Sequence, residues 1–140
     1  MKFNKFIFFV LVSVLMSVTV LVQKGRAINV TVPEELEATL FSPNTLTPCV
    51  ACIGVAPTGE VFAGVDQIGS LGKGGGKGKI IRLIDADNDG VSEAHTVYAL
   101  IDNPRGIVPV GDKLYVLHTK WGEGTQFDGM FLSVLEDKDG

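Results

Sequence analysis

The stretch CIGVAPTGEVFAGV, residues 52–65, consists of an apolar run, a Pro-Thr-Gly-Glu turn and a second apolar run. Short apolar runs on either side of a turn that contains proline and glycine are typical of two antiparallel strands joined tightly. Residues 105–118, RGIVPVGDKLYVLH, show the same order of runs and turn. The sequence therefore predicts two β-hairpins of similar design.

The two hairpins belong to an internal repeat. A shift of 52 residues places glycine on glycine, proline on proline and acid on acid. The matched pairs are Gly54 with Gly106, Val55 with Ile107, Pro57 with Pro109, Gly59 with Gly111 and Glu60 with Asp112. After a one-residue insertion at Lys113, Val61 and Phe62 match Leu114 and Tyr115. The shift of 52 also carries Asp85 onto Asp137 and Asp87 onto Asp139. Separate matches at one shift indicate a repeat.

A repeat of about fifty residues with about four strands is the signature of a β-propeller blade. The predicted class is all-β, with one short helical turn near residues 33–40 and strands at residues 51–56, 61–65, 79–84, 94–101, 105–110, 113–118 and 130–135. Residues 49–140 hold about two blades, whereas a closed propeller needs at least four. We expect incomplete blades, from an N-terminal fragment or a truncated gene product, with an unpaired strand edge and an exposed apolar face.

The first 27 residues have the composition of a secretory signal peptide. Lys2 and Lys5 precede an uncharged apolar stretch at residues 6–22, and the small residues Gly25 and Ala27 follow it. This order predicts cleavage after Ala27. A retained membrane anchor is the alternative, because the apolar stretch approaches the length that spans a bilayer. In either case residues 28–140 are expected to be exported, periplasmic or extracellular, with residues 28–48 as a linker before the blades.

Residues 28–140 are acidic, with eight basic and sixteen acidic side chains and a formal net charge of −8. This balance leaves no basic patch for nucleic acid or anionic lipid. Membrane contact is therefore expected only through an uncleaved N-terminal segment. The acidity suits a protein that meets calcium outside the cytoplasm.

Residues 85–93, DADNDGVSE, predict a calcium site. Asp85, Asp87, Asp89 and Glu93 occupy positions 1, 3, 5 and 9 of a loop between two predicted strands, and Val91 offers its backbone carbonyl at position 7. Carboxylates at this density repel one another unless a cation lies among them, and an oxygen-only ligand set favours calcium.

The acidic loop is not an EF-hand, because position 12 is Thr96 and the predicted flanking elements are strands. A nine-residue loop closed by an acid resembles the calcium loops in the β-hairpins of integrin-type propellers. A solvated acidic turn is the alternative, since Asp-Asn-Asp-Gly clusters are also ordinary turn chemistry.

Two other motifs do not fit the functions that they first suggest. GSLGKGGGKGK, residues 69–79, lacks the glycine spacing and the following helix of a phosphate-binding loop, so a flexible loop is predicted. CVAC, residues 49–52, lacks the histidine of a haem attachment motif. Cys49 and Cys52 are interpreted as buried thiols or as a disulfide at a strand entrance.

The segment VFAGVDQIGSLGKGGGKGKIIRLIDADNDGVSEAHTVYALIDNPRGIVPVGDKLYVLHT, residues 61–119, carries a family resemblance. It resembles the start of the secreted, propeller-type "membrane-bound dehydrogenase" proteins of planctomycete and verrucomicrobial type. Those proteins are similar to the quinoprotein glucose/sorbosone dehydrogenases. The resemblance extends over about residues 45–140 and implies a six-bladed propeller with a quinone, PQQ, on its axis and a sugar or alcohol as substrate.

Two functions stay open on these grounds. One is an oxidoreductase of the glucose/sorbosone dehydrogenase type, of which residues 1–140 alone would be inactive because the axial site needs every blade. Arg105 and His118, at strand ends that face the axial funnel in propellers, are its candidate site residues, and a purely structural role is the alternative for both. The other function is a calcium-stabilised propeller that binds a partner without chemistry, and fold alone does not decide between them.

Overall fold

The computed structural model of the chain describes residues 30–66, 74–123 and 125–138. The predicted signal segment, residues 1–27, lies outside these ranges, as does Asp139. The described ranges contain seven strands and no helix. The helical turn expected near residues 33–40 is a simple turn, closed by the Leu36 amide donating to the Pro33 carbonyl at 3.0 Å. No helix among the described residues is long and apolar enough to cross a membrane.

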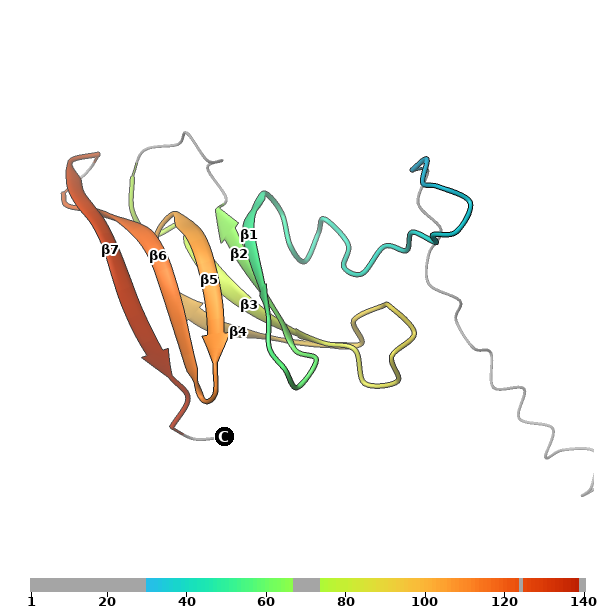
Figure 1. The fold of residues 1–140 in the computed structure, drawn as a ribbon. Helices are drawn as coiled ribbons and strands as arrows, with labels where there is room; N and C mark the ends of the chain where they lie inside the picture. Colours follow the sequence, from blue (N-terminus) through green and yellow to red (C-terminus); the bar gives the residue numbers. More distant parts are fainter. Residues whose placement is uncertain (1–29, 67–73, 124, 139–140) are drawn as a thin grey trace, which may run out of the picture.

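The first sheet is a four-stranded antiparallel meander in the order β1-β2-β3-β4 (Figure 1). The turn between its first two strands is closed by the Ala56 amide donating to the Glu60 carbonyl at 2.9 Å. Gly59 in that turn has φ +94°, a conformation that glycine adopts without steric cost. The strands are β1 Val50–Val55, β2 Val61–Asp66, β3 Gly78–Ile84 and β4 Ala94–Leu100.

The second sheet has three antiparallel strands in the order β5-β6-β7. These strands are β5 Pro104–Val110, β6 Lys113–Trp121 and β7 Phe127–Glu136. All seven predicted strands are confirmed. β6 and β7 are longer than predicted, because their pairing continues as far as Trp121 opposite Phe127.

The two sheets pack face to face, with β1 against β5 (Figure 1). In the core between the sheets, the rings of Phe62 and Tyr98 meet edge to face, with centroids 5.2 Å apart. Each fully buried aliphatic or aromatic side chain there contributes about 1.5–3 kcal/mol to folding. The buried residues of this core are Ala56, Phe62, Ile80, Ile107, Leu114 and Val116.

A second core lies on the rear face of the first sheet, defined here as the face turned away from the second sheet. Its buried residues come from β2 and β3, and Phe41 and Leu46 of the predicted linker pack against them. The linker therefore forms part of the fold, because it covers apolar side chains that water would otherwise contact. The buried residues are Ala63, Val65, Ile81 and Leu83.

The all-β class is confirmed, and two consecutive antiparallel sheets that pack face to face are compatible with about two propeller blades. That these sheets belong to a propeller, and that the propeller has six blades, stays a prediction. The 52-residue repeat agrees with this arrangement. It carries β1 onto the region of β5, and each of these strands is the first strand of its sheet.

Candidate metal centre

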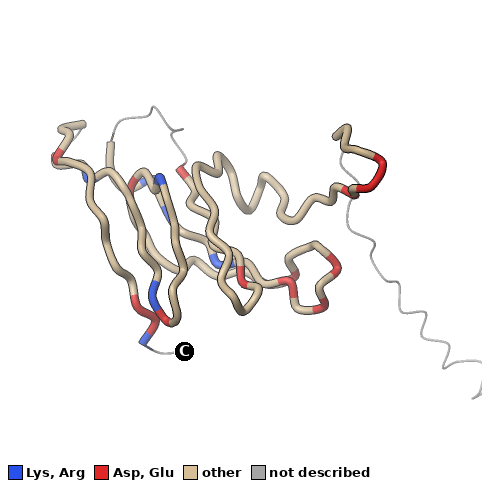
Figure 2. Tube along the Cα trace, in the orientation of Figure 1, with Lys and Arg blue, Asp and Glu red and all other residues tan. Residues whose placement is uncertain are grey.

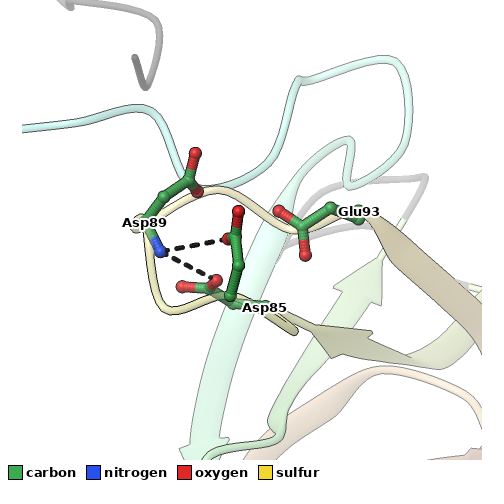
Figure 3. A group of neighbouring side chains, drawn as sticks. Asp85, Asp89 and Glu93 are labelled. Atoms are coloured by element: carbon green, nitrogen blue, oxygen red, sulfur yellow. Dashed lines mark hydrogen bonds between the residues drawn. The ribbon is translucent and has the colours of Figure 1, made fainter. Parts of the chain in front are cut away.

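The acidic loop is the tip of the hairpin that β3 and β4 form, as the sequence predicted. Ile84 ends β3, and its carbonyl accepts a hydrogen bond from the Glu93 amide at 3.1 Å. Asp85 and Glu93 therefore face each other across the base of the loop, and Asp89 lies at its far end (Figure 3). The rigid strand pair beneath thus sets the separation of the first and last carboxylates.

Hydrogen bonds inside the loop orient its carboxylates. Asp85 accepts from the amides of Asp89, at 3.1 Å, and Gly90, at 2.9 Å. Glu93 accepts from the Ala86 amide at 2.7 Å. The chain can turn sharply enough for these bonds because Asn88 has φ +59° and Gly90 has φ +84°, values that asparagine and glycine tolerate best.

Asp85, Asp87, Asp89 and Glu93 are brought together by this turn. One carboxylate oxygen from each residue lies within 4.8 Å of those of the other three. Ligands on opposite sides of a calcium ion lie about 4.6–5.2 Å apart, because each calcium–oxygen bond is about 2.3–2.6 Å long. A single calcium ion could therefore contact all four carboxylates. Figure 2 shows acidic residues along this loop, and the sequence has no lysine or arginine between residues 85 and 93.

Val91 lies in the loop at the predicted position. Its amide donates to Asp89 Oδ1 at 2.9 Å, and that bond holds the Asp89 side chain back toward the loop. The role of the Val91 carbonyl as a fifth ligand stays a prediction. Asp85 and Asp89 are half-buried, whereas Asp87 and Glu93 are exposed, so the loop is open to ions from solvent.

The predicted linker also supports the loop. The Thr39 hydroxyl donates to the Gly90 carbonyl at 3.3 Å, and the Ser92 amide donates to the Phe41 carbonyl at 2.9 Å. Sequence reasoning missed this contact, because nothing in the pattern of residues 28–48 indicates which later segment they touch. The only available signal was the apolar pair formed by Leu40 and Phe41.

Arg105 and His118 lie on the second sheet, away from the hairpin that carries the acidic loop. Arg105 is the extra residue of a bulge in β5, between Pro104 and Gly106. His118 is 8% exposed, and its Nε2 lies 2.9 Å from the hydroxyl oxygen of Ser133. Its Nδ1 is buried without a hydrogen-bond partner among the described residues. Their place at an axial funnel stays a prediction.

The two cysteines differ in their surroundings. Cys49 is exposed rather than buried, and Cys52 is half-buried; both are free thiols. Burial raises the pKa of the Cys52 thiol above its usual value, while a backbone hydrogen bond from Gly64 and the charge of Arg105 partly oppose the increase. Cys52 thus remains a neutral thiol at physiological pH.

A buried polar chain near the ends of β2 and β6 was not predicted. Trp121 Nε1 donates to the side-chain oxygen of Asn103, and Asn103 Nδ2 donates to Asp66 Oδ2 at 2.5 Å. Asp66 and Asn103 are each 1% exposed. These hydrogen bonds tie the end of β2, in the first sheet, to Trp121 of β6, in the second sheet, which is a structural role.

Comparison of the chain with protein-family models, curated proteins and solved structures gave no match. A functional assignment therefore rests on the geometry of the described residues.

Proposed function

We propose that the chain is a calcium-binding unit of an exported β-propeller, with one calcium ion held by the loop at residues 85–93. The observation that carries the proposal is the convergence of four carboxylates from one short loop, with oxygens within 4.8 Å of one another. The β3–β4 hairpin fixes the two ends of that loop.

The donor set favours calcium over other metals. It contains only oxygen atoms, whereas zinc and copper sites usually include imidazole or thiolate ligands. Magnesium requires an octahedral shell at about 2.0–2.1 Å and gives up its water reluctantly. An exposed loop with four carboxylates accommodates the longer and less regular bonds of calcium more easily.

Calcium would stabilise the fold as well as fill the site. The ion cancels the mutual repulsion of the four carboxylates, and it binds only where the loop holds them together. Binding to the folded state alone adds about 2.7 kcal/mol to the free energy of unfolding when free calcium is a hundredfold above the dissociation constant.

Calorimetric titration of the purified chain with calcium tests this proposal. We expect one ion per chain, and Asp89→Ala should raise the dissociation constant at least about tenfold by removing a ligand. Asp128→Ala is the matched control, since Asp128 is a surface acid that lies 3.5 Å from Lys120. Asp102 is unsuitable as a control because its carboxylate accepts a hydrogen bond from the Gly76 amide at 2.6 Å. Equal affinity in wild type and Asp89→Ala would mean that the acids form only a solvated turn.

We also propose, from the family resemblance, that the complete propeller oxidises a sugar or other alcohol through PQQ. Arg105 and His118 support this proposal by their place near one end of the β5–β6 pair, where Pro104 pairs with His118. Two hollows between the sheets are lined by other residues. One, of about 100 Å³, includes Arg82 and Tyr98, and the other runs between β4 and β7.

The described residues thus provide two candidate contacts for PQQ and no enclosed site for it, so the chain alone is expected to be inactive. A titration of the complete propeller with PQQ, followed by absorbance, tests the dehydrogenase proposal. Saturable binding that Arg105→Ala abolishes would favour the dehydrogenase. Calcium binding without any affinity for PQQ would favour the alternative, a propeller that binds a partner without chemistry.

A further inference from the structure

The outer face of the second sheet, defined as the face turned away from the first sheet, is apolar and uncovered by the described residues. Along β6 the side chains of Leu114 and Val116 point to the first sheet, so Tyr115 and Leu117 point outward. The strand register places Leu132 beside Leu117 and Val134 beside Tyr115. The exposed apolar residues of this face are Val108, Val110, Leu117, Met130, Leu132 and Val134, from 39% exposed at Leu117 to 66% at Leu132.

The rear face of the first sheet is also partly open. Phe41 and Leu46 cover its centre, on β2 and β3, but they leave the side chains of β1 exposed. Ile53 is 63% exposed and Val55 is 59% exposed, and both point to the rear because Gly54 between them faces the second sheet. The chain therefore carries two uncovered apolar strips on opposite sides.

The packing of the two sheets within the chain indicates which kind of surface is complementary to these strips. Gly54 lies so close to the second sheet that a Cβ atom on it would be 2.8 Å from Ile107 Cγ2 and 3.0 Å from Pro109 Cδ. β5 thus fits into a groove that exists only because β1 has a glycine at this point. The first sheet presents the glycine, and the second presents an isoleucine and a proline.

Because of the repeat, the two open strips carry the counterparts of the two surfaces that meet inside the chain. A shift of 52 residues carries Gly54 onto Gly106, and Ile107 back onto Val55. Gly106 points to the outer face of the second sheet, and a Cβ atom there would have only Leu117 Cβ nearby, at 3.7 Å. The outer face therefore carries the open glycine groove, and the rear face carries the aliphatic side chain that corresponds to its occupant.

We propose that the outer face of the second sheet binds the rear face of a second copy of this chain, with Val55 of the second copy over Gly106. The contact repeats, between chains, the packing of β5 on β1 within the chain. Such a contact joins two different surfaces, so it is head-to-tail and can continue from copy to copy into a ring or a filament. Exposed apolar patches of this kind are typical of interaction surfaces.

Sedimentation velocity of the full chain in a mild non-ionic detergent, over a range of protein concentrations, tests this proposal. We expect wild type to form species larger than a dimer as the concentration increases. Leu132→Glu places a charge on the outer face and Ile53→Glu places one on the rear face, so each should weaken association at least about tenfold. Leu36→Glu is the matched control, because Leu36 is 62% exposed and lies in the linker, outside both sheets. Circular dichroism verifies that the variants fold.

A mixture of the two variants gives the decisive result. Leu132→Glu keeps an intact rear face and Ile53→Glu keeps an intact outer face, so an equimolar mixture should form a dimer of one copy each and nothing larger. The proposal is wrong if wild type stays monomeric at every concentration. It is also wrong if only Leu132→Glu blocks association, which would mean that two outer faces meet, or if neither variant does, which would assign association to another segment such as residues 1–29.

Discussion

The hydroxyl of Thr39 donates a hydrogen bond to the carbonyl oxygen of Gly90 at 3.3 Å, across 51 residues of sequence. The neighbouring bond from the Ser92 amide to the Phe41 carbonyl, at 2.9 Å, holds the same two segments together. Phe41 also packs on the rear face of the first sheet. The acidic loop is thus fastened to the segment that covers one of the two cores, and ordering of one favours ordering of the other.

Thr39→Val should weaken calcium binding about three- to tenfold. Valine keeps the shape of threonine but removes the hydroxyl, and a hydrogen bond of this kind contributes about 0.5–1.5 kcal/mol. Without it, more of the ordering of the loop has to occur when the ion binds. Calorimetric titration measures the change, with the exposed Thr45→Val as control. An unchanged dissociation constant in Thr39→Val would show that residues 39–41 do not support the site.

Gly54→Ala should destabilise the chain by about 1–3 kcal/mol. The added Cβ would meet Ile107 Cγ2 and the Ile107 carbonyl oxygen at 2.8 Å, so the two sheets would have to move apart. Gly106→Ala is the repeat-matched control, since its Cβ would meet only Leu117 Cβ, at 3.7 Å, and neither glycine has positive φ.

Urea unfolding of the two glycine variants, at a protein concentration where the chain is monomeric, measures the difference. Gly106→Ala should stay within about 0.5 kcal/mol of wild type. Similar losses in both variants would contradict the close approach at Gly54, because the cost would then come from the backbone rather than from the sheet contact.

Cys52 should react with thiol reagents much more slowly than Cys49. The thiolate is the reactive form, and burial raises the Cys52 pKa, so its thiolate fraction near neutral pH is small. The folded state then holds this proton more tightly than the unfolded state. The stability that comes from the neutral thiol is full below the usual pKa of cysteine and falls as the pH rises through the raised value.

Stopped-flow labelling of Cys49→Ser and Cys52→Ser, each with one remaining thiol, measures the two rates separately. The rate for Cys52 should keep rising above the usual pKa of a cysteine thiol. Equal rates for the two variants at neutral pH would mean that the Cys52 thiol is accessible and not held against Gly64 of β2.

The strands could be predicted from sequence because each is a short apolar run bounded by glycine, proline or acidic residues. Pairing within hairpins follows from short connections, and the acidic loop was predicted because its carboxylates are close in sequence. The cover formed by Phe41 and Leu46 could not be predicted, since the apolar residues of this segment, which is rich in proline and threonine, show no clear periodicity. The link from Asp66 to Asn103 spans 37 residues and has no local signal.

His118 shows a similar limit of the sequence. The pattern indicated a strand that ends at this residue, where a side chain could face a funnel. β6 instead continues to Trp121, because its partner β7 begins as early as Phe127. His118 therefore lies inside the strand and packs beside Phe131, with ring centroids 6.2 Å apart. The length of β7, the partner strand, thus places His118 inside β6 rather than at its end.

Asp87→Asn should change stability in opposite directions with and without calcium. Asp87 is exposed, and its one hydrogen bond within the loop, from the Asp89 amide at 3.3 Å, survives in asparagine. Without calcium, the variant loses repulsion from three neighbouring carboxylates and should gain about 0.5 kcal/mol. With saturating calcium, it loses a charged ligand and should be less stable than wild type by about 1 kcal/mol or more.

Thermal unfolding with excess chelator and with excess calcium measures both effects on the same samples. Asp128→Asn is the control, because it removes one surface negative charge outside the loop and should shift both conditions alike. A solvated acidic turn would give the gain in stability without the loss, since it has no ion to release. A metal centre requires the sign to reverse, because the repulsion that destabilises the empty loop is the same charge density that binds the ion.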